Sequence, residues 1–573
     1  MKDQVFYPDR LSIDWLKEKY RSGILSPEQV VEEIILRCKR YEDYNIWITP
    51  PDMIWISSYL DRLKQLDPSL PLWGIPFAIK DNIDLAGIPT TAACPGYSYT
   101  PIENATVVDR LIQAGAIPIG KTNMDQFATG LVGTRSPYGE CHNALDPEMI
   151  SGGSSSGSSV CVALGLAAFA LGTDTAGSGR VPAMLNNLIG YKPPIGAWST
   201  RGVVPACASL DCVTVFAGNL KDAKAVDSIA RGYDDDCPWS RDIAEKTDAL
   251  PEVIYLPKDS PEFFGEWKDE YEAKWDRTQK RITGLAKKRG IRVELLDCKM
   301  FADAAKILYE GAYVAERWAD LKDFVETHPG ETFPVTETIL RSGAKPEQTA
   351  AKLFDNLHEL QAYKHKAHAL LKNGLLILPT AGGSFTRDQV REDPIKTNSK
   401  MGLYTNHCNL LDMTAIAVPL SLADTVRPFG ITAFGRFDRE DLVFGFAEAF
   451  MSEETATFAV CGLHKHGREL AYQLEELGAH YTETVTTAGE YMLYEIPSVP
   501  VKPGLVRCKT GGNEIEVDLY EMPVDAFGKF IRHVKEPLTI GDVILCDGRI
   551  VKGFLCQEYI IDMCKDITDR GRF

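Results

Sequence analysis

The sequence has no long uninterrupted run of apolar residues. Its longest apolar stretches, such as Val160–Leu171, are shorter than the ~20 residues that a helix needs to cross a bilayer. The amino-terminal residues Met-Lys-Asp-Gln-Val-Phe also lack the apolar segment of a secretory signal. We therefore expect a cytoplasmic protein that neither spans nor binds a membrane.

Basic residues are fewer than acidic ones, and no two cysteines have the C-x-x-C spacing. The chain carries 62 Lys and Arg against 80 Asp and Glu, a formal net charge of −18, which repels phosphate backbones at long range and argues against a nucleic-acid partner. The 14 cysteines show no C-x-x-C spacing, as expected for reduced thiols in a cytosolic protein. Cys141 and His142 are adjacent, a poor arrangement for one metal ion, so no metal site is predicted.

The remaining composition is that of a globular α/β protein with two domains. With 573 residues, 45% hydrophobic and 25% charged, the chain is too long for one simple core. Up to Met451, strand-like apolar segments alternate with helical ones, which is typical of β-α-β units. After the polar connector Ser452–Ala456 come shorter strand-like runs, clearest in the alternation of Glu514–Tyr520. We predict an α/β domain over 1–451 and a small β-rich domain over 452–573.

The element boundaries follow from periodicity and from turn residues. Ser26 followed by Pro27 predicts a capped helix start. The predicted helices are 11–20, 27–41, 106–114, 157–165, 180–187, 262–290, 300–327 and 346–371. The predicted strands are 73–83, 116–120, 167–172, 375–378, 411–418, 429–434, 456–461, 479–487, 491–496, 504–510 and 514–520.

Two glycine-rich loops carry the residues that indicate chemistry. Ser154 lies in Ser151–Ser159, Ser178 lies in Leu171–Arg180, and Lys80 ends an apolar run upstream. A serine hydroxyl attacks a carbonyl only after a base removes its proton, and lysine is such a base only when burial lowers its pKa. We interpret Lys80, Ser154 and Ser178 as a proton relay of an amide hydrolase. Lys80 could otherwise simply leave the core at a strand end.

The backbone of the second loop suits an oxyanion hole. The loop precedes a predicted helix, whose first N–H groups have no partner within the helix. The N–H groups of Thr175, Ala176, Gly177 and Ser178 could therefore converge on one developing oxyanion. A glycine-rich turn with a solvent-facing serine is the alternative. The first loop could also cradle a phosphate, but it lacks the lysine of the Gly-Lys-Ser/Thr signature.

These motifs together resemble the amidase signature family. The matching motifs are Ala-Ile-Lys-Asp-Asn, Gly-Gly-Ser-Ser-Ser-Gly and Gly-Thr-Asp-Thr-Ala-Gly-Ser-Gly-Arg. The resemblance implies a mixed central sheet covered by helices, Ser178 as nucleophile, Ser154 as bridging serine and Lys80 as general base. It also implies a cis peptide bond between Gly153 and Ser154, no metal or organic cofactor, and a homodimer formed by the large domain.

Within that family, Leu308–Trp318 is similar to the substrate segment of the allophanate hydrolases. The resemblance implies that Tyr309 and Arg317 hold the substrate carboxylate, which suits the two-pronged guanidinium. If both lie on one helix, eight residues advance about 800°, and the side chains point within ~80° of each other. An amphipathic helix with a solvated arginine is the alternative.

The segments Val460–His464 and Val501–Val506 resemble the carboxy-terminal domain of the allophanate hydrolases, which has a γ-glutamyl-cyclotransferase-like fold. The resemblance implies decarboxylation of N-carboxycarbamate there, with His464 as the matching histidine. The chain departs from the usual pattern directly afterwards, reading Lys-His-Gly-Arg, and a lone histidine is more often structural.

The resemblance thus implies hydrolysis of allophanate to ammonia and carbon dioxide, with a biotin-dependent urea carboxylase supplying the substrate. Three alternatives stay open. The chain could be another small-amide amidase, the glutamine-hydrolysing subunit of a tRNA-dependent amidotransferase, or a scaffold without activity that binds a nucleotide or a partner protein.

Overall fold

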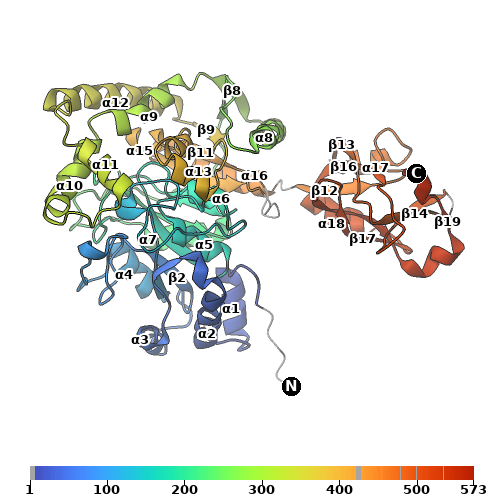
Figure 1. The fold of residues 1–573 in the computed structure, drawn as a ribbon, viewed down its shortest axis with the longest axis horizontal. Helices are drawn as coiled ribbons and strands as arrows, with labels where there is room; N and C mark the ends of the chain where they lie inside the picture. The colour runs from blue at the N-terminus through green and yellow to red at the C-terminus, as the bar shows by residue number, and fades with distance from the viewer. Residues whose placement is uncertain are drawn as a thin grey trace. The chain divides into compact units, whose positions relative to one another are not determined.

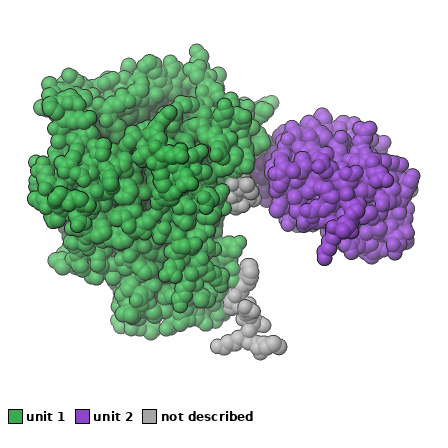
Figure 2. Space-filling model, viewed as in Figure 1, with its two compact units in different colours: residues 1–451 green, residues 452–573 purple. Residues whose placement is uncertain are grey.

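The computed structural model describes residues 7–420, 427–452, 455–475, 477, 479–498, 500–532 and 534–573. The chain divides into two compact units, Met1–Met451 and Ser452–Phe573 (Figure 2). Each unit has its own sheets and its own clusters of buried apolar side chains. Among the helices in the described ranges, none is long and apolar enough to cross a bilayer.

The large unit is built on one 11-stranded sheet with the strand order β1-β3-β2-β4-β6-β5-β10-β11-β9-β7-β8. Strand β2 pairs in parallel with β3 and β4, whereas β4 pairs antiparallel with β6, so the predicted mixed sheet is confirmed. The strands are β1 (Trp47–Thr49), β2 (Pro76–Lys80), β3 (Ile117–Thr122), β4 (Phe169–Asp174), β5 (Ile189–Lys192), β6 (Cys212–Ala217), β7 (Val253–Pro257), β8 (Arg292–Leu296), β9 (Gly374–Pro379), β10 (Met413–Pro419) and β11 (Gly430–Arg436).

Helices cover this sheet, as Figure 1 shows. They are α1 (Ile13–Arg21), α2 (Pro27–Cys38), α3 (Met53–Leu63), α4 (Thr106–Gln113), α5 (Ser156–Ala163), α6 (Val181–Leu185), α7 (Leu220–Ala230), α8 (Lys268–Arg289), α9 (Lys299–Glu310), α10 (Val314–Thr327), α11 (Pro334–Ser342), α12 (Ala350–Leu370), α13 (Arg387–Glu392), α14 (Lys396–Met401), α15 (His407–Leu410) and α16 (Glu440–Ser452). The predicted start of α2 is confirmed. Ser26 Oγ accepts from the Gln29 N–H at 3.3 Å, and Gln29 Oε1 accepts from the Ser26 N–H at 2.9 Å, which satisfies two otherwise free donors.

The prediction of one helix over 300–327 is wrong. The chain forms α9 and α10, with Gly311 in an extended conformation between them (φ −87°, ψ −169°). A tertiary contact stabilises this break, because Asn356 on α12 accepts the N–H of Ala312 at 2.9 Å. Sequence periodicity carries no signal for such a partner, which lies far along the chain.

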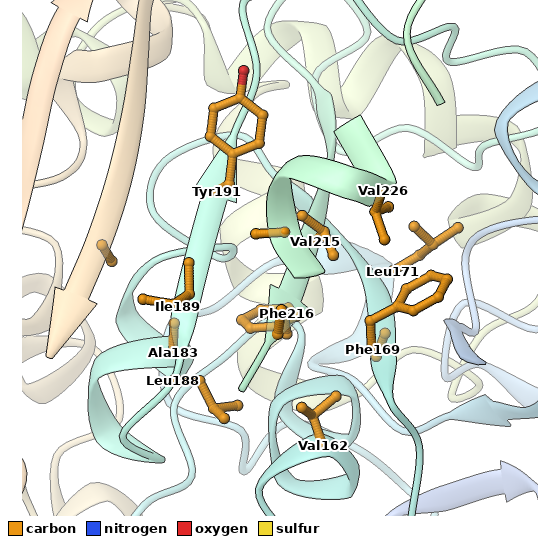
Figure 3. Close-up of a cluster of buried hydrophobic side chains, with 14 of the residues drawn as sticks. Val162, Phe169, Leu171, Ala183, Leu188, Ile189, Tyr191, Val215, Phe216 and Val226 are labelled. Atoms are coloured by element: carbon orange, nitrogen blue, oxygen red, sulfur yellow. The ribbon is translucent and has the colours of Figure 1, made fainter. Parts of the chain in front are cut away.

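Buried apolar side chains pack between the helices α5 and α7 and the central strands β4, β5 and β6 (Figure 3). Phe169 and Phe216 are fully buried there, and Phe169 stacks on Phe77 of β2 with 5.3 Å between ring centroids. Helix α5 approaches its neighbours closely, since a Cβ on Gly157 would lie 2.3 Å from the Ile46 carbonyl oxygen. This close packing fixes the loop that precedes α5.

The small unit is rich in strands, as predicted. It has a five-stranded sheet in the order β13-β16-β12-β18-β17 and a three-stranded sheet in the order β15-β14-β19. The elements are β12 (Thr455–Val460), α17 (Ala471–Glu475), β13 (His480–Thr486), β14 (Tyr491–Ile496), β15 (Lys502–Arg507), β16 (Glu516–Pro523), α18 (Val524–Ile531), β17 (Leu538–Ile544), β18 (Ile550–Cys556) and β19 (Lys565–Asp566). The sequence prediction missed β17, β18 and β19.

Candidate active site

Lys80 is the last residue of β2 and is completely buried. Its Nζ lies 2.7 Å from Ser154 Oγ and donates to Thr173 Oγ1, also at 2.7 Å. Burial removes the hydration of the ammonium and lowers the pKa of Lys80 to about 7, although Asp125 and Asp211 act in the opposite direction. A substantial fraction of the amine is therefore uncharged near neutral pH, as a general base requires.

Ser154 is held beside Lys80 by the loop before α5. The Gly153–Ser154 peptide bond is cis, as the family resemblance implied. The Ser154 carbonyl oxygen accepts from the Asp125 N–H at 3.0 Å. A Cβ on Gly153 would lie 1.9 Å from the Asp125 carboxylate, so position 153 must be glycine. The motif's glycine and Asp125 thus fix the backbone that carries the Ser154 hydroxyl.

Ser178 follows β4 and is 4% exposed. Its Oγ lies 3.5 Å from the Gly130 carbonyl oxygen. Among the hydrogen bonds of the described residues, none joins the Ser154 and Ser178 hydroxyls. The structure therefore brings Lys80 and Ser154 into direct contact, whereas Ser178 lies in the same buried region without a direct bond to Ser154.

The loop after β4 is organised by Asp174. Its Oδ1 accepts from the Gly177 N–H at 2.8 Å, and Oδ2 accepts from the Gly179 N–H at 3.0 Å. Arg180 completes a buried ion pair with two bonds to this carboxylate, at 2.9 and 3.0 Å. Burial alone would raise the pKa of Asp174, but the Arg180 guanidinium, Lys192 and the Gly179 N–H together lower it overall.

These bonds correct one part of the predicted oxyanion hole. Gly177 is excluded as a donor, because the Asp174 carboxylate already accepts its N–H. In the described part of the chain, the N–H groups of Thr175, Ala176 and Ser178 have no protein acceptor. Three of the four predicted donors are thus available to an oxyanion.

Two supporting residues were missed by the sequence analysis. Buried Asp211 accepts from the Thr175 hydroxyl and from the N–H groups of Ala206 and Cys207, the latter two at 2.8 and 3.1 Å. Its burial raises the pKa of Asp211 to about 6. Thr173, the second partner of Lys80, was also missed. Thr173 lies within the quoted motif, but Asp211 has no local signal, because it reaches the loop only through the pairing of β4 with β6.

Tyr309 and Arg317 meet, but not for the predicted reason. Tyr309 lies on α9 and Arg317 on α10, so the angular argument for a single helix is wrong. The Arg317 guanidinium carbon nevertheless lies 5.7 Å from the centroid of the Tyr309 ring. The fold of two consecutive helices, and not helical periodicity, brings the two side chains together.

Arg317 is a buried cation that no carboxylate contacts directly, although Asp211 and Glu316 are among the charges that act on it. It is 2% exposed, and its Nη1 donates to Thr129 Oγ1 at 3.0 Å. Within the described residues it forms no ion pair with a carboxylate. Burial disfavours the charge, but neighbours including Tyr309 and Cys207 raise the pKa of Arg317 overall. Since an unpaired buried charge is costly, this guanidinium is suited to a small anionic ligand.

His464 lies in the small unit, among aromatic rings. It stacks on Phe554 with 5.5 Å between centroids and meets Phe530 edge-on at 5.6 Å. Its Nε2 lies 3.0 Å from Gln473 Oε1. Burial lowers the pKa of His464, so the imidazole is neutral at physiological pH. The geometry fits a packed histidine and also a neutral proton acceptor.

Comparison with known proteins agrees with this architecture. The family model described as Amidase matches residues 29–444, and the model of the allophanate hydrolase C-terminal domain matches residues 456–573. The urea amidolyase of Saccharomyces cerevisiae is 39% identical over 579 residues, which cover 92% of this chain and 31% of that protein. This chain therefore spans about a third of the length of that relative, as it does for the urea amidolyase of Lachancea kluyveri (31%).

Two solved structures are similar over nearly the whole chain. The allophanate hydrolase of Kluyveromyces lactis superposes with a TM-score of 0.70 at 36% identity, covering 98% of both chains. The urea amidolyase of the same organism gives a TM-score of 0.70 at 37% identity, covering 98% of this chain and 36% of that one.

Proposed function

The chain belongs to the amidase family, and from that premise we propose that it hydrolyses allophanate to ammonia and carbon dioxide through N-carboxycarbamate. The observation that carries the choice of substrate is the guanidinium of Arg317, which is buried and forms no ion pair with a described carboxylate. It lies in the same unit as Ser178, and the adjacent loop residues Thr129 and Gly130 contact Arg317 and Ser178 respectively. Allophanate offers what this arrangement needs, a small carboxylate attached to a primary amide. The similarity of the complete chain to allophanate hydrolase and urea amidolyase structures supports the same choice.

The proposed acylation step uses the three relay residues in order. Lys80 takes the proton of Ser154, Ser154 takes the proton of Ser178, and Ser178 Oγ attacks the terminal amide carbon. The N–H groups of Thr175, Ala176 and Ser178 stabilise the oxyanion. The C–N bond then breaks, and the proton returns along the relay to the leaving nitrogen, which departs as ammonia. Hydrogen bonds of this kind commonly tighten when substrate binds, so we propose that the Ser154 and Ser178 hydroxyls approach at that stage.

In the deacylation step, a water molecule takes the place of Ser178 in the relay. Lys80 and Ser154 remove one of its protons, the hydroxide attacks the acyl carbon, and the ester bond to Ser178 breaks. The Ser178 oxygen recovers its proton from the relay. The product is N-carboxycarbamate, whose remaining carboxylate stays on Arg317 and Tyr309 until release.

The small unit is proposed to act on that product. Neutral His464 would assist loss of carbon dioxide from N-carboxycarbamate, and the match to the allophanate hydrolase C-terminal domain supports this role. A biotin-dependent urea carboxylase would supply allophanate, and the large unit would form a homodimer. Both are proposals about partners, supported by the similarity to urea amidolyase and by the family resemblance respectively.

Initial rates of ammonia release over a panel of amides test the proposed function. The panel contains allophanate, biuret, malonamate, glutamine and a fatty amide. We expect the highest kcat/KM for allophanate, a lower value for malonamate, and very low values for the others. Only the first two have a carboxylate one atom away from the amide carbon, whereas glutamine carries its carboxylate three carbons away, next to an ammonium group. Preference for glutamine would favour an amidotransferase subunit and contradict the proposal.

A further inference from the structure

Two adjacent loop residues contact the two groups on which the proposed reaction depends. Thr129 Oγ1 accepts from Arg317 Nη1 at 3.0 Å. The carbonyl oxygen of the next residue, Gly130, lies 3.5 Å from Ser178 Oγ. Arg317 and Ser178 come from α10 and from the loop after β4, and the bonded pair Thr129–Gly130 connects them through these two contacts.

The Thr129 hydroxyl accepts from Arg317, because a guanidinium has no acceptor atom, and its own proton is therefore free for a second partner. The hydroxyl donates to the Phe127 carbonyl oxygen at 3.1 Å. The bond to Thr129 Oγ1 is the one hydrogen bond that Arg317 makes among the described residues. Without it, the guanidinium would keep its contact with the Tyr309 ring but lose the bond that orients its plane.

The loop itself is anchored on several sides. Arg135 donates to the Thr129 carbonyl oxygen at 2.8 Å and to the Pro394 carbonyl oxygen at 2.7 Å. Asn398 Oδ1 accepts the Leu131 N–H at 2.7 Å. The Asp125 carboxylate accepts three further N–H groups of the loop, those of Val132, Gly133 and Arg135.

Space restricts the loop further. A Cβ on Gly130 would lie 2.5 Å from Asp125 Oδ2. The loop backbone therefore has little freedom to shift, and these contacts restrain the position of Thr129 Oγ1 relative to the Gly130 carbonyl oxygen.

We propose that Thr129 is a positioning residue that sets the separation between the anion-binding guanidinium of Arg317 and the nucleophilic oxygen of Ser178. The inference rests on the proposed function and extends it to a residue that does not touch the substrate. A carboxylate held on Arg317 would present the amide carbon at a distance fixed through Thr129 and Gly130. Reaction rates depend steeply on this distance, since an error of about 1 Å is enough to lose much of the benefit of positioning.

The Thr129→Val variant removes the hydroxyl and keeps the shape of the side chain. We expect KM for allophanate to rise about tenfold or more, since hydrogen bonds to charged groups are among the stronger ones. The value of kcat should fall as well, because the amide carbon is then no longer held at the right distance from Ser178 Oγ. Biuret has the same skeleton with an amide in place of the carboxylate, so its kcat/KM should change by a much smaller factor. Equal losses on both substrates, or an unchanged KM for allophanate, would overturn the inference.

Two further variants separate positioning from a general defect in folding. Thr129→Ser retains the hydroxyl and should recover most of the affinity. Thr336→Val is the matched control. Thr336 is a buried threonine on α11, next to α10, and its Oγ1 has no hydrogen-bond partner among the described residues. This variant should leave KM within about twofold of wild type, as expected for a site where no bond is lost. If Thr129→Ser loses as much affinity as Thr129→Val, the hydroxyl does not position Arg317.

Binding measured without turnover completes the test. In a Ser178→Ala background, calorimetric titration with allophanate should show the same loss of affinity on adding Thr129→Val. The proposed function and the proposed role of Thr129 would be contradicted by different results. If the wild-type protein releases no ammonia from allophanate, the proposed function is wrong. If it does, and Thr129→Val binds and turns over allophanate normally, only the role of Thr129 is wrong.

Discussion

The amine nitrogen of Lys80 lies 2.7 Å from the hydroxyl oxygen of Ser154, and both side chains are shielded completely from solvent. In the proposed relay, the first transfer therefore needs no rearrangement of these two side chains. The second transfer, from Ser178 to Ser154, has no hydrogen bond among the described residues. The proposed relay therefore requires that substrate binding brings the Ser154 and Ser178 hydroxyls together.

The pH dependence of the reaction follows from the burial of Lys80. The base is the uncharged amine, and burial lowers the pKa of Lys80 from 10.5 to about 7. We therefore expect kcat/KM for ammonia release to increase with pH through about 7 and to level off above it. A pH profile of initial rates on allophanate measures this. A profile that keeps rising toward pH 10 would show that Lys80 titrates like an exposed lysine.

Removal of the Arg317 charge should act mainly on anionic substrates. For Arg317→Met, we expect kcat/KM for allophanate to fall about 100-fold or more, as for loss of a charge-assisted bond pair, and for biuret to fall far less. Arg341→Met is the matched control, since Arg341 also lies over an aromatic ring, that of Trp318 at 5.8 Å, but its side chain is 46% exposed. Equal losses on the two substrates in Arg317→Met would refute the anion site.

The ion pair of Asp174 and Arg180 should be important for stability. Asp174→Asn leaves the buried Arg180 charge uncompensated, which typically costs about 3–5 kcal/mol. We expect a clear decrease in the denaturant midpoint of the large unit together with loss of activity. Glu337→Gln, which breaks the exposed pair with Arg341, should shift the free energy of unfolding by less than about 1 kcal/mol. An unchanged midpoint in Asp174→Asn would mean that another contact holds the oxyanion loop.

His464 is tested by replacing its ring with one of similar shape. His464→Phe keeps an aromatic ring between Phe530 and Phe554 and removes the contact with Gln473. We expect release of the first ammonia to be unchanged and release of carbon dioxide to slow. His466→Phe is the control, because His466 stacks on Tyr481 at 4.4 Å in the same unit. If both variants release carbon dioxide at the wild-type rate, His464 serves only in packing.

Short-range sequence signals predicted the local structure around Lys80, Ser154 and Ser178 well. The capped start of α2, the glycine-rich turns around Ser154 and Ser178, and Lys80 at the end of β2 depend on neighbours within a few residues. The family resemblance supplied the roles, the cis bond and the mixed sheet. The oxyanion set was too large by one residue, since the bond from Gly177 to Asp174 depends on how the turn closes.

Long-range contacts account for the rest. The break at Gly311 depends on Asn356, and the site residues Asp211 and Thr129 act through partners that lie on other elements. None of these side chains stands in a recognisable local pattern. The strands β17 and β18 were also missed. Strand β18 pairs with β12, which lies far along the chain, and β17 pairs with β18 as a hairpin at the edge of the sheet.

The most direct test of the central claim compares ammonia release from allophanate by the wild-type protein and by Lys80→Met. Methionine fills the volume of the buried lysine but cannot accept a proton. The relay predicts efficient release by the wild type and a loss of about 10⁴-fold or more in kcat for the variant, comparable to the loss of other catalytic bases. A Lys80→Met protein that folds normally and keeps kcat within tenfold of wild type would contradict the relay.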